Sequence, residues 1–157
     1  MTERPPLHVT YMQLAETWAR QATCCRAQVG CVLVDADRHV IASGFNGAPR
    51  GLPHCEVSWE HKDADHCQHS LHAEMNALLQ CARVGVSCRG ASLYTTHLPC
   101  RLCAMMIVQV GIVGVMFAAE YGSDPGLHVL RNAKLEVAQY NAHTRQLTWL
   151  TERRLSR

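Results

Sequence analysis

The sequence predicts one α/β domain of three layers, in which helices cover both faces of a central, mostly parallel mixed sheet of five strands. Two observations predict this class. Segments with helical periodicity alternate with short β-branched runs along the 157 residues. The first two strand-like runs are joined by a short turn, whereas helices separate the later ones, which should therefore run parallel. No repeat or linker divides the chain, so we expect residues 1–157 to form one domain, with a core at about 7–140 and an extension at 141–157.

The N-terminal part of the chain predicts a helix followed by a β-hairpin. Apolar side chains recur every three or four residues within 7–20, which is typical of an amphipathic helix; they are Leu7, Tyr11, Leu14, Ala15 and Trp18. The apolar run 29–34 ends at the polar turn 35–38, and residues 39–45 resume the strand pattern. These two runs therefore predict the hairpin.

The second half of the chain alternates between helices and strands. A helix rich in Ala, Leu and Met is expected at 72–83, and a second helix at 100–110 lies between Pro99 and Gly111. The remaining expected elements are helices at 124–133 and 144–154 and strands at 91–96, 112–118 and 135–140.

Composition narrows the function classes. The net charge of +2 is too small to indicate a nucleic-acid-binding protein. No apolar run approaches the roughly 18–20 residues of a membrane span, and no apolar stretch with a cleavage site follows the N-terminus, so we expect a cytoplasmic protein. The nine cysteines are an odd number without a secretory signal, which argues against a disulfide scaffold. Together with ten histidines they favour metal binding.

Residues 46–71 form a long segment with little periodicity. The segment holds several glycines and prolines, two cysteines and four histidines: Cys55, Cys67, His54, His61, His66 and His69. So long a connection inside one domain is rarely structureless. Its composition suggests that a metal orders it.

Two short motifs carry the chemistry, His72-Ala-Glu74 and Pro99-Cys100-Arg-Leu-Cys103. Both fall at the expected start of a helix, where the partial positive charge of the N-terminus favours thiolate. Cys100 and Cys103 are three residues apart, so their sulfurs point the same way from a first helical turn. With His72 they supply three zinc ligands, which leaves a fourth tetrahedral position for water, as in a catalytic site.

Glu74 gives this zinc site a proton carrier. Zinc lowers the pKa of its water to about 7. Glu74 can take the proton of that water, pass it to a ring nitrogen and protonate a departing amine. The backbone N–H of Ala73 is a candidate donor to the developing oxygen. A structural zinc site would leave Glu74 without a role, and a redox cysteine pair would leave His72 without one, so the motifs together indicate a zinc-dependent deaminase.

The chain resembles the deoxycytidylate (dCMP) deaminases of the zinc-dependent cytidine deaminase superfamily. The resemblance extends over about 29–137 and is most specific in the G-x-N-G-x-P-x-G stretch at 44–51, beyond the two zinc motifs. It implies the three-layer cytidine-deaminase-like fold. It also implies hydrolysis of dCMP to dUMP and ammonia, in which zinc-activated water attacks C4 of the cytosine.

The resemblance implies substrate contacts as well. Asn46 would hydrogen-bond the sugar hydroxyl near the zinc, although an Asn-Gly pair is also a strong turn signal and the two roles are compatible. Tyr121 would border the base or sugar, or else simply pack. Arg26 and Arg50 are candidate phosphate contacts. Many family members carry a basic residue where this chain has Val113-Gly114, so this chain lacks that candidate phosphate contact.

Regulation and assembly are also implied by the resemblance. These enzymes are commonly homo-oligomers, often hexamers, activated by dCTP with Mg²⁺ and inhibited by dTTP. Gly44 and Gly47 of the glycine-rich loop and Arg83 match positions associated with that regulation. Arg83 could equally be an interfacial or a solvated arginine.

A second, structural zinc is the last implication of the resemblance, because some bacterial and phage members hold one through cysteines before the first strand and in the long loop. The matching positions are Cys24, Cys55 and Cys67, with His66 as the fourth ligand and His54 or His69 as alternatives to it. Such a zinc would order the 46–71 segment. The alternative is a set of thiols that binds no metal.

Other functions stay open from the sequence. A deaminase of RNA or DNA bases would need a basic groove for a flipped base, which the small net charge disfavours. A catalytically silent nucleotide sensor would have no need of Glu74. The sequence does not distinguish dCMP from another cytosine nucleotide, including one modified on the base.

Overall fold

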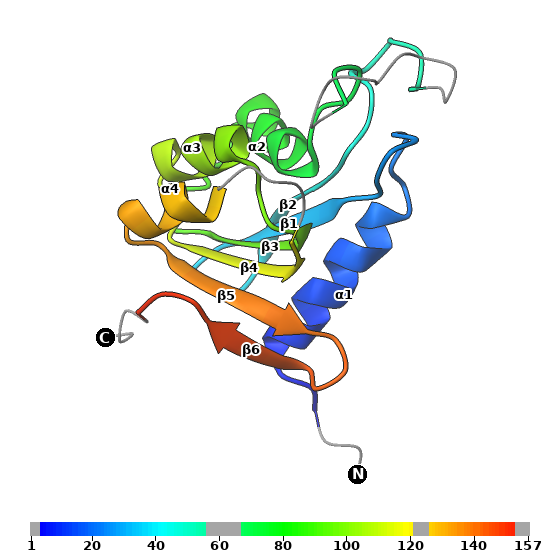
Figure 1. Ribbon diagram of the computed structural model, residues 1–157. Helices are drawn as coiled ribbons and strands as arrows, with labels where there is room; N and C mark the ends of the chain where they lie inside the picture. Colours follow the sequence, from blue (N-terminus) through cyan, green and yellow to red (C-terminus); the bar gives the residue numbers. More distant parts are fainter. Residues whose placement is uncertain (1–3, 56–66, 121–125, 153–157) are drawn as a thin grey trace.

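The computed structural model describes residues 4–55, 67–120 and 126–152, and its centre is a mixed sheet of six strands in the order β2-β1-β3-β4-β5-β6 (Figure 1). The strands are β1 (Gly30–Val34), β2 (Val40–Phe45), β3 (Ser92–His97), β4 (Gly114–Ala119), β5 (Glu136–Asn141) and β6 (Gln146–Trp149). β3, β4 and β5 are parallel neighbours, whereas β1 runs antiparallel to both β2 and β3. The four strands that helices separate therefore all run in one direction, as the sequence predicts.

Four helices in the described part of the chain cover this sheet: α1 (Leu7–Ala19), α2 (Ala73–Val84), α3 (Arg101–Gln109) and α4 (Gly126–Asn132). α1 lies on one face, and α2, α3 and α4 lie on the other (Figure 1). The predicted three layers are thus confirmed. Among the described residues, no helix is long and apolar enough to span a membrane.

The prediction of a C-terminal helix at 144–154 is wrong. Gln146–Trp149 of that segment form β6, which pairs antiparallel with β5. The turn between them is built locally: the side-chain Oδ1 of Asn141 accepts hydrogen bonds from the backbone N–H groups of His143 and Thr144, at 2.9 and 3.0 Å. Arg145 then adopts a left-handed φ of 57°. The sheet consequently has one strand more than the five expected.

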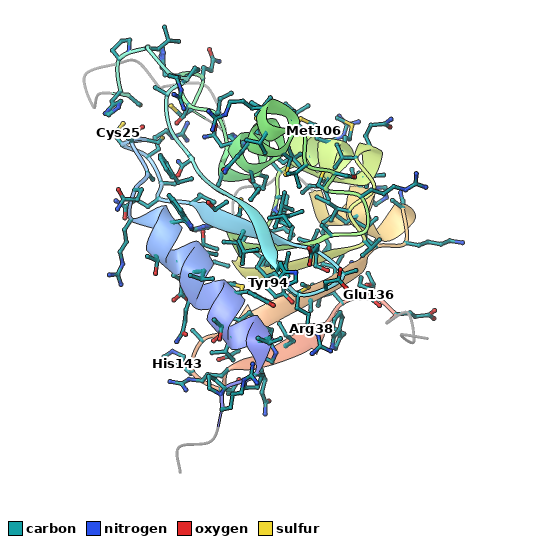
Figure 2. The ribbon with its side chains drawn as sticks, turned by 180° about the vertical axis from the view of Figure 1, so that it is seen from behind. Cys25, Arg38, Tyr94, Met106, Glu136 and His143 are labelled. Carbon is teal, nitrogen blue, oxygen red and sulfur yellow. The ribbon has the colours of Figure 1, made fainter. Side chains whose placement is uncertain are left out.

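Hydrophobic side chains are buried on both faces of the sheet. The main core lies between the sheet and the helices on the α2 face, and its fully buried members include Leu93, Ile107 and Phe117. On the opposite face the rings of Tyr11 and Tyr94 pack with centroids 4.9 Å apart. Figure 2 shows Tyr94 at this interface between α1 and the sheet. Burial on both faces explains why all five residues of β1 are buried.

Gly30, the first residue of β1, lies directly against α1. A Cβ atom at this position would overlap the carbonyl oxygen of Ala15 and the backbone of Ala19. The absence of a side chain therefore sets how closely α1 approaches the sheet.

Replacing this glycine tests that approach. Gly30→Ala should lower the free energy of unfolding by about 1–3 kcal/mol, because rigid backbone atoms must move to admit the methyl group. Gly114→Ala is the matched control, since its Cβ would meet the Ser92 hydroxyl at 3.2 Å, and that side chain can rotate away. Urea unfolding measures both variants. Equal losses of stability would contradict the tight contact with α1.

Candidate active site

Two helix N-termini bring the motif residues together. His72 and Cys100 are the residues that precede the first turns of α2 and α3, and both have extended backbone conformations. Cys103 lies in the first turn of α3 and is fully buried. Nδ1 of His72 lies 3.5 Å from Sγ of Cys100 and 3.3 Å from Sγ of Cys103. The three donor atoms are all within 4.8 Å of one another, as the sequence motifs require.

A hydrogen bond links the two sulfurs of this triad. The Cys103 thiol donates a hydrogen bond to Sγ of Cys100, which lowers the pKa of Cys100 to about 3 and raises the pKa of Cys103. The hydrogen bond with Cys100 also raises the pKa of His72, against the opposing effect of burial. One imidazole and two thiol sulfurs converging at helix N-termini form a donor set that suits zinc and leaves one tetrahedral position open.

Glu74 lies beside the triad, in the first turn of α2, with only 4% of its surface exposed. Burial raises the pKa of its carboxyl group, against the lowering effects of a backbone hydrogen bond and of His72. Within the described residues the three-donor cluster does not include this carboxylate. Glu74 is thus placed to handle protons next to the cluster rather than to complete it.

A pocket opens over these groups. Its lining includes His72, Ala73, Glu74 and Cys100 from the helix starts, together with Asn46 and Arg26. Ala73, the candidate N–H donor, is buried at the first position of α2, where backbone N–H groups have no partner within the helix. Arg26 is exposed. Tyr121, the other expected substrate contact, lies outside the described residues.

The side chain of Asn46 links its own segment to the segment 27–29, and both segments line this pocket. Its Oδ1 accepts a hydrogen bond of 2.7 Å from the backbone N–H of Val29, and its Nδ2 donates one of 2.8 Å to the carbonyl of Ala27. Gly47 does not close a turn here but pairs with Leu71 in an isolated antiparallel bridge. The amide keeps a further hydrogen on Nδ2 and a further lone pair on Oδ1 for a ligand.

A second groove gathers two of the residues expected at an effector site, Gly44 and Arg83, and the candidate phosphate contact Arg50. Gly44, Arg50 and Arg83 line it, together with Trp18 and Phe45, whose rings stack with centroids 6.0 Å apart. The groove lies between α2 and β2, an edge strand of the sheet.

The two glycines of the expected effector loop are placed differently. Gly47 is not part of the groove lining; a Cβ there would meet the Thr23 hydroxyl at 2.5 Å. Gly44 does line the groove, but its backbone also lies against the carbonyl of Ala73. Close packing therefore explains the absence of a side chain at both positions, independently of any effector.

The second cysteine cluster is also assembled. The sulfurs of Cys24, Cys55 and Cys67 all lie within 4.8 Å of one another. Burial raises the pKa of Cys24, but hydrogen bonds from the backbone at Arg26 and Ala27 outweigh it, so that the pKa is lowered on balance. The pKa of Cys67 is raised to about 12, mainly by burial. In this cluster too, the pKa of one sulfur is lowered and that of another is raised.

The histidine expected as the fourth ligand of this cluster is not found among the described residues. Among the described residues, the ring nitrogens of His54 and His69 are not part of the donor set, and His66 lies outside those residues. A side chain that the sequence interpretation did not assign is nearby instead: Sγ of Cys25 lies 3.3 Å from Sγ of Cys55. The adjacency of Cys25 to Cys24 was the available signal.

The sequence profile described as the cytidine and deoxycytidylate deaminase zinc-binding region matches residues 6–119. The chain belongs to this family. Over 123 residues it is 40% identical to the ComE operon protein 2 of Bacillus subtilis, covering 78% of this chain and 65% of that protein. It is 37% identical to the deoxycytidylate deaminase of Schizosaccharomyces pombe, covering 87% of this chain and 45% of the relative. The chain thus spans between about half and two thirds of the length of these relatives.

The chain is also similar in structure to a solved deaminase. The dCMP deaminase of the cyanophage S-TIM5, crystallised with dCMP and dUMP, superposes with a TM-score of 0.77 and 34% identity. The match covers 87% of this chain and 98% of that one. The cytidine-deaminase-like fold is therefore shown, and zinc is the metal of the family region that these residues match.

Counting zinc in substituted chains tests both clusters. We expect about two zinc ions per chain, and about one in either Cys103→Ser or Cys67→Ser, because each change removes one ligand of one cluster. Cys88→Ser, a buried cysteine of the main core, is the control that keeps both ions. Elemental analysis after gel filtration gives the counts, and circular dichroism confirms folding. A count of about one in the unchanged protein would show that the Cys24–Cys55–Cys67 cluster holds no zinc.

Proposed function

We propose that this protein hydrolyses dCMP to dUMP and ammonia. The observation that carries the proposal is the pocket lined by His72, Cys100 and the buried Glu74, where Cys103 lies close enough to complete the donor triad. Relatives named deoxycytidylate deaminases and the S-TIM5 enzyme crystallised with dCMP and dUMP support the choice of substrate.

Each group at the pocket has a separate role in the proposed hydrolysis. A zinc ion held by the triad supplies Lewis acidity, which makes water a usable nucleophile near neutral pH. Glu74 accepts a proton from the attacking water and delivers it to N3 of the cytosine; it then takes the proton of the new hydroxyl group at C4 and gives it to the departing amine. Water supplies the new carbonyl oxygen at C4, and the exocyclic nitrogen leaves as ammonia. The N–H of Ala73, at the positive end of α2, donates to the developing oxygen.

The burial of Glu74 suits this task. A carboxyl group with a raised pKa binds a proton more readily than an exposed one and can pass it on twice in one turnover. Its burial also strengthens its electrostatic interaction with the reacting ring.

The rest of the nucleotide is held by the pocket wall. Asn46 is fixed by Val29 and Ala27, so its remaining hydrogen-bonding positions are preorganised for the sugar hydroxyl. Arg26, exposed at the lining of the same pocket, is the candidate for the 5′-phosphate. Arg50 and Arg83 line the other groove, which we assign to a nucleoside triphosphate effector such as dCTP with Mg²⁺, or dTTP.

The proposal includes assembly into a homo-oligomer. Large apolar side chains are exposed on α2 and α3: Leu79, Val84, Leu102 and Met105. Figure 2 shows the neighbouring Met106 on the outer side of this helical layer. A second copy of the chain covering these helices would remove this apolar surface from water.

Substrate assays with a Glu74→Gln variant test the reaction. The unchanged protein should release ammonia from dCMP faster than from dCTP, deoxycytidine, 5-substituted dCMP or a single-stranded oligonucleotide. Glu74→Gln should keep the zinc count and lose turnover by a factor on the order of 10²–10⁴, because the amide cannot carry protons. Ammonia release from none of these compounds by the zinc-loaded protein would exclude the enzyme. Full activity of the variant would exclude Glu74 as the proton carrier.

Substitution of two arginines separates the phosphate contact from the effector groove. Arg26→Ala should raise KM for dCMP by about tenfold or more while hardly changing KM for deoxycytidine, since it removes a charge-assisted hydrogen bond to phosphate. Arg83→Ala is the matched control: it should keep KM for dCMP and lose the response to dCTP and dTTP. Steady-state kinetics with and without Mg²⁺ and effector measure both. The same loss for both substrates in Arg26→Ala would argue against a phosphate contact.

A further inference from the structure

Cys25 forms a second sulfur pair at the edge of the three-cysteine cluster. Its Sγ lies 3.3 Å from Sγ of Cys55, and Sγ of Cys55 lies 3.5 Å from Sγ of Cys67. Cys25 nevertheless does not belong to the set of sulfurs that all lie within 4.8 Å of one another, which is Cys24, Cys55 and Cys67. Cys55 therefore belongs to the three-sulfur donor set and also contacts the thiol of Cys25, which lies outside that set.

The two members of this pair differ in exposure. Cys25 is exposed, whereas Cys55 and the adjacent Cys24 are buried. Figure 2 shows Cys25 at the edge of the molecule, beyond the end of α1. A small oxidant can reach Cys25 from solvent and meet a second sulfur in contact behind it, which is the arrangement of an oxidisable dithiol.

We propose that Cys25 and Cys55 form a disulfide when the protein meets a peroxide, and that this disulfide withdraws Cys55 from the cluster. Whichever sulfur reacts first attacks a peroxide oxygen, breaks the O–O bond and becomes a sulfenic acid, with release of water. The other sulfur then attacks the sulfenic sulfur, forms the S–S bond and releases a second water. Two thiols are oxidised to a disulfide and one peroxide is reduced to two waters. A thiol reductant reverses the step by exchange.

Exposure, rather than distance, distinguishes the Cys25–Cys55 pair from the neighbouring Cys55–Cys67 contact of 3.5 Å, because among these sulfurs Cys25 alone belongs to an exposed residue. The sulfurs of Cys25 and Cys55 must close from 3.3 Å to about 2.0 Å, a movement that side-chain rotation on two loop residues can supply. Cys24, next to Cys25 in sequence, is directed to Ser70 and Cys67 instead. The disulfide therefore leaves Cys24 and Cys67 as a remnant with too few ligands for a closed zinc site.

The reaction connects redox state to the pocket, because Cys24 and Cys67 line the same pocket as His72 and Glu74. Loss of the shared ligand loosens the segment that bears Cys67 and Ser70, and with it one wall of the active site. Oxidation would thus reduce deaminase activity without touching the catalytic triad.

Treatment of the zinc-loaded full chain with hydrogen peroxide tests the proposal. A chromogenic chelator should report the loss of about one zinc per chain. Intact mass should fall by two hydrogens, and peptide mapping without reductant should yield a cross-linked peptide containing Cys25 and Cys55. Cys25→Ser should start with the same zinc content and release zinc about tenfold more slowly, because the exposed partner is missing. Cys88→Ser is the control, since Cys88 lies in the buried core beside Cys81; it should behave as the unchanged protein.

Each alternative outcome decides against the proposal in a distinct way. A Cys25→Ser protein that loses one zinc before any oxidant is added would show that Cys25 is itself a ligand. Equal release rates in the two proteins, or a cross-link that omits Cys25, would show that another sulfur is oxidised. A protein that forms the cross-link but holds only one zinc beforehand would disprove the release of metal. None of these readouts depends on dCMP, so a failed substrate assignment leaves the test intact.

Discussion

The contact between β2 and the first turn of α2 fixes the position of the candidate active site. Gly44 brings the strand so close to the helix that a Cβ atom would overlap the carbonyl of Ala73. His72 and Glu74 flank that alanine in sequence, so this backbone contact fixes the position of one member of the donor triad and of the proposed proton carrier. Gly126 makes a comparable contact with the carbonyl of Pro99, immediately before Cys100. Each half of the site is thus held against the rest of the fold by one glycine contact, which favours the rigid donor positions that metal ligation demands.

Much of this arrangement could be predicted from the sequence, because its determinants are local. Strand and helix periodicities located all the expected central elements, and the two zinc motifs named the three donors that the fold brings together. The error at 144–154 has a local cause as well. The turn there depends on the side chain of Asn141 and on a left-handed arginine, signals that periodicity does not contain.

Long-range relations were less accessible. That Asn46 ties its own segment to Val29 and Ala27 depends on where two loops pass each other. The contact of Cys25 with Cys55 likewise requires the end of α1 and the segment after β2 to meet. A shared groove for Gly44, Arg50 and Arg83 follows from the packing of α2 on an edge strand. Such facts are properties of tertiary packing, and no spacing in the sequence encodes them.

The position of β1 between β2 and β3 has a consequence for how the chain assembles during synthesis. β1 and β2 can pair as soon as both have emerged, but the other edge of β1 stays open until the chain has passed the 46–71 segment and α2 and reached β3. An open hydrophobic strand edge invites pairing with other chains. Ligation of Cys24, Cys55 and Cys67 would close that long loop before β3 arrives and shorten the remaining search for its partner. The Cys24–Cys55–Cys67 cluster, two members of which line the pocket in the folded protein, would then also stabilise the incomplete sheet during synthesis.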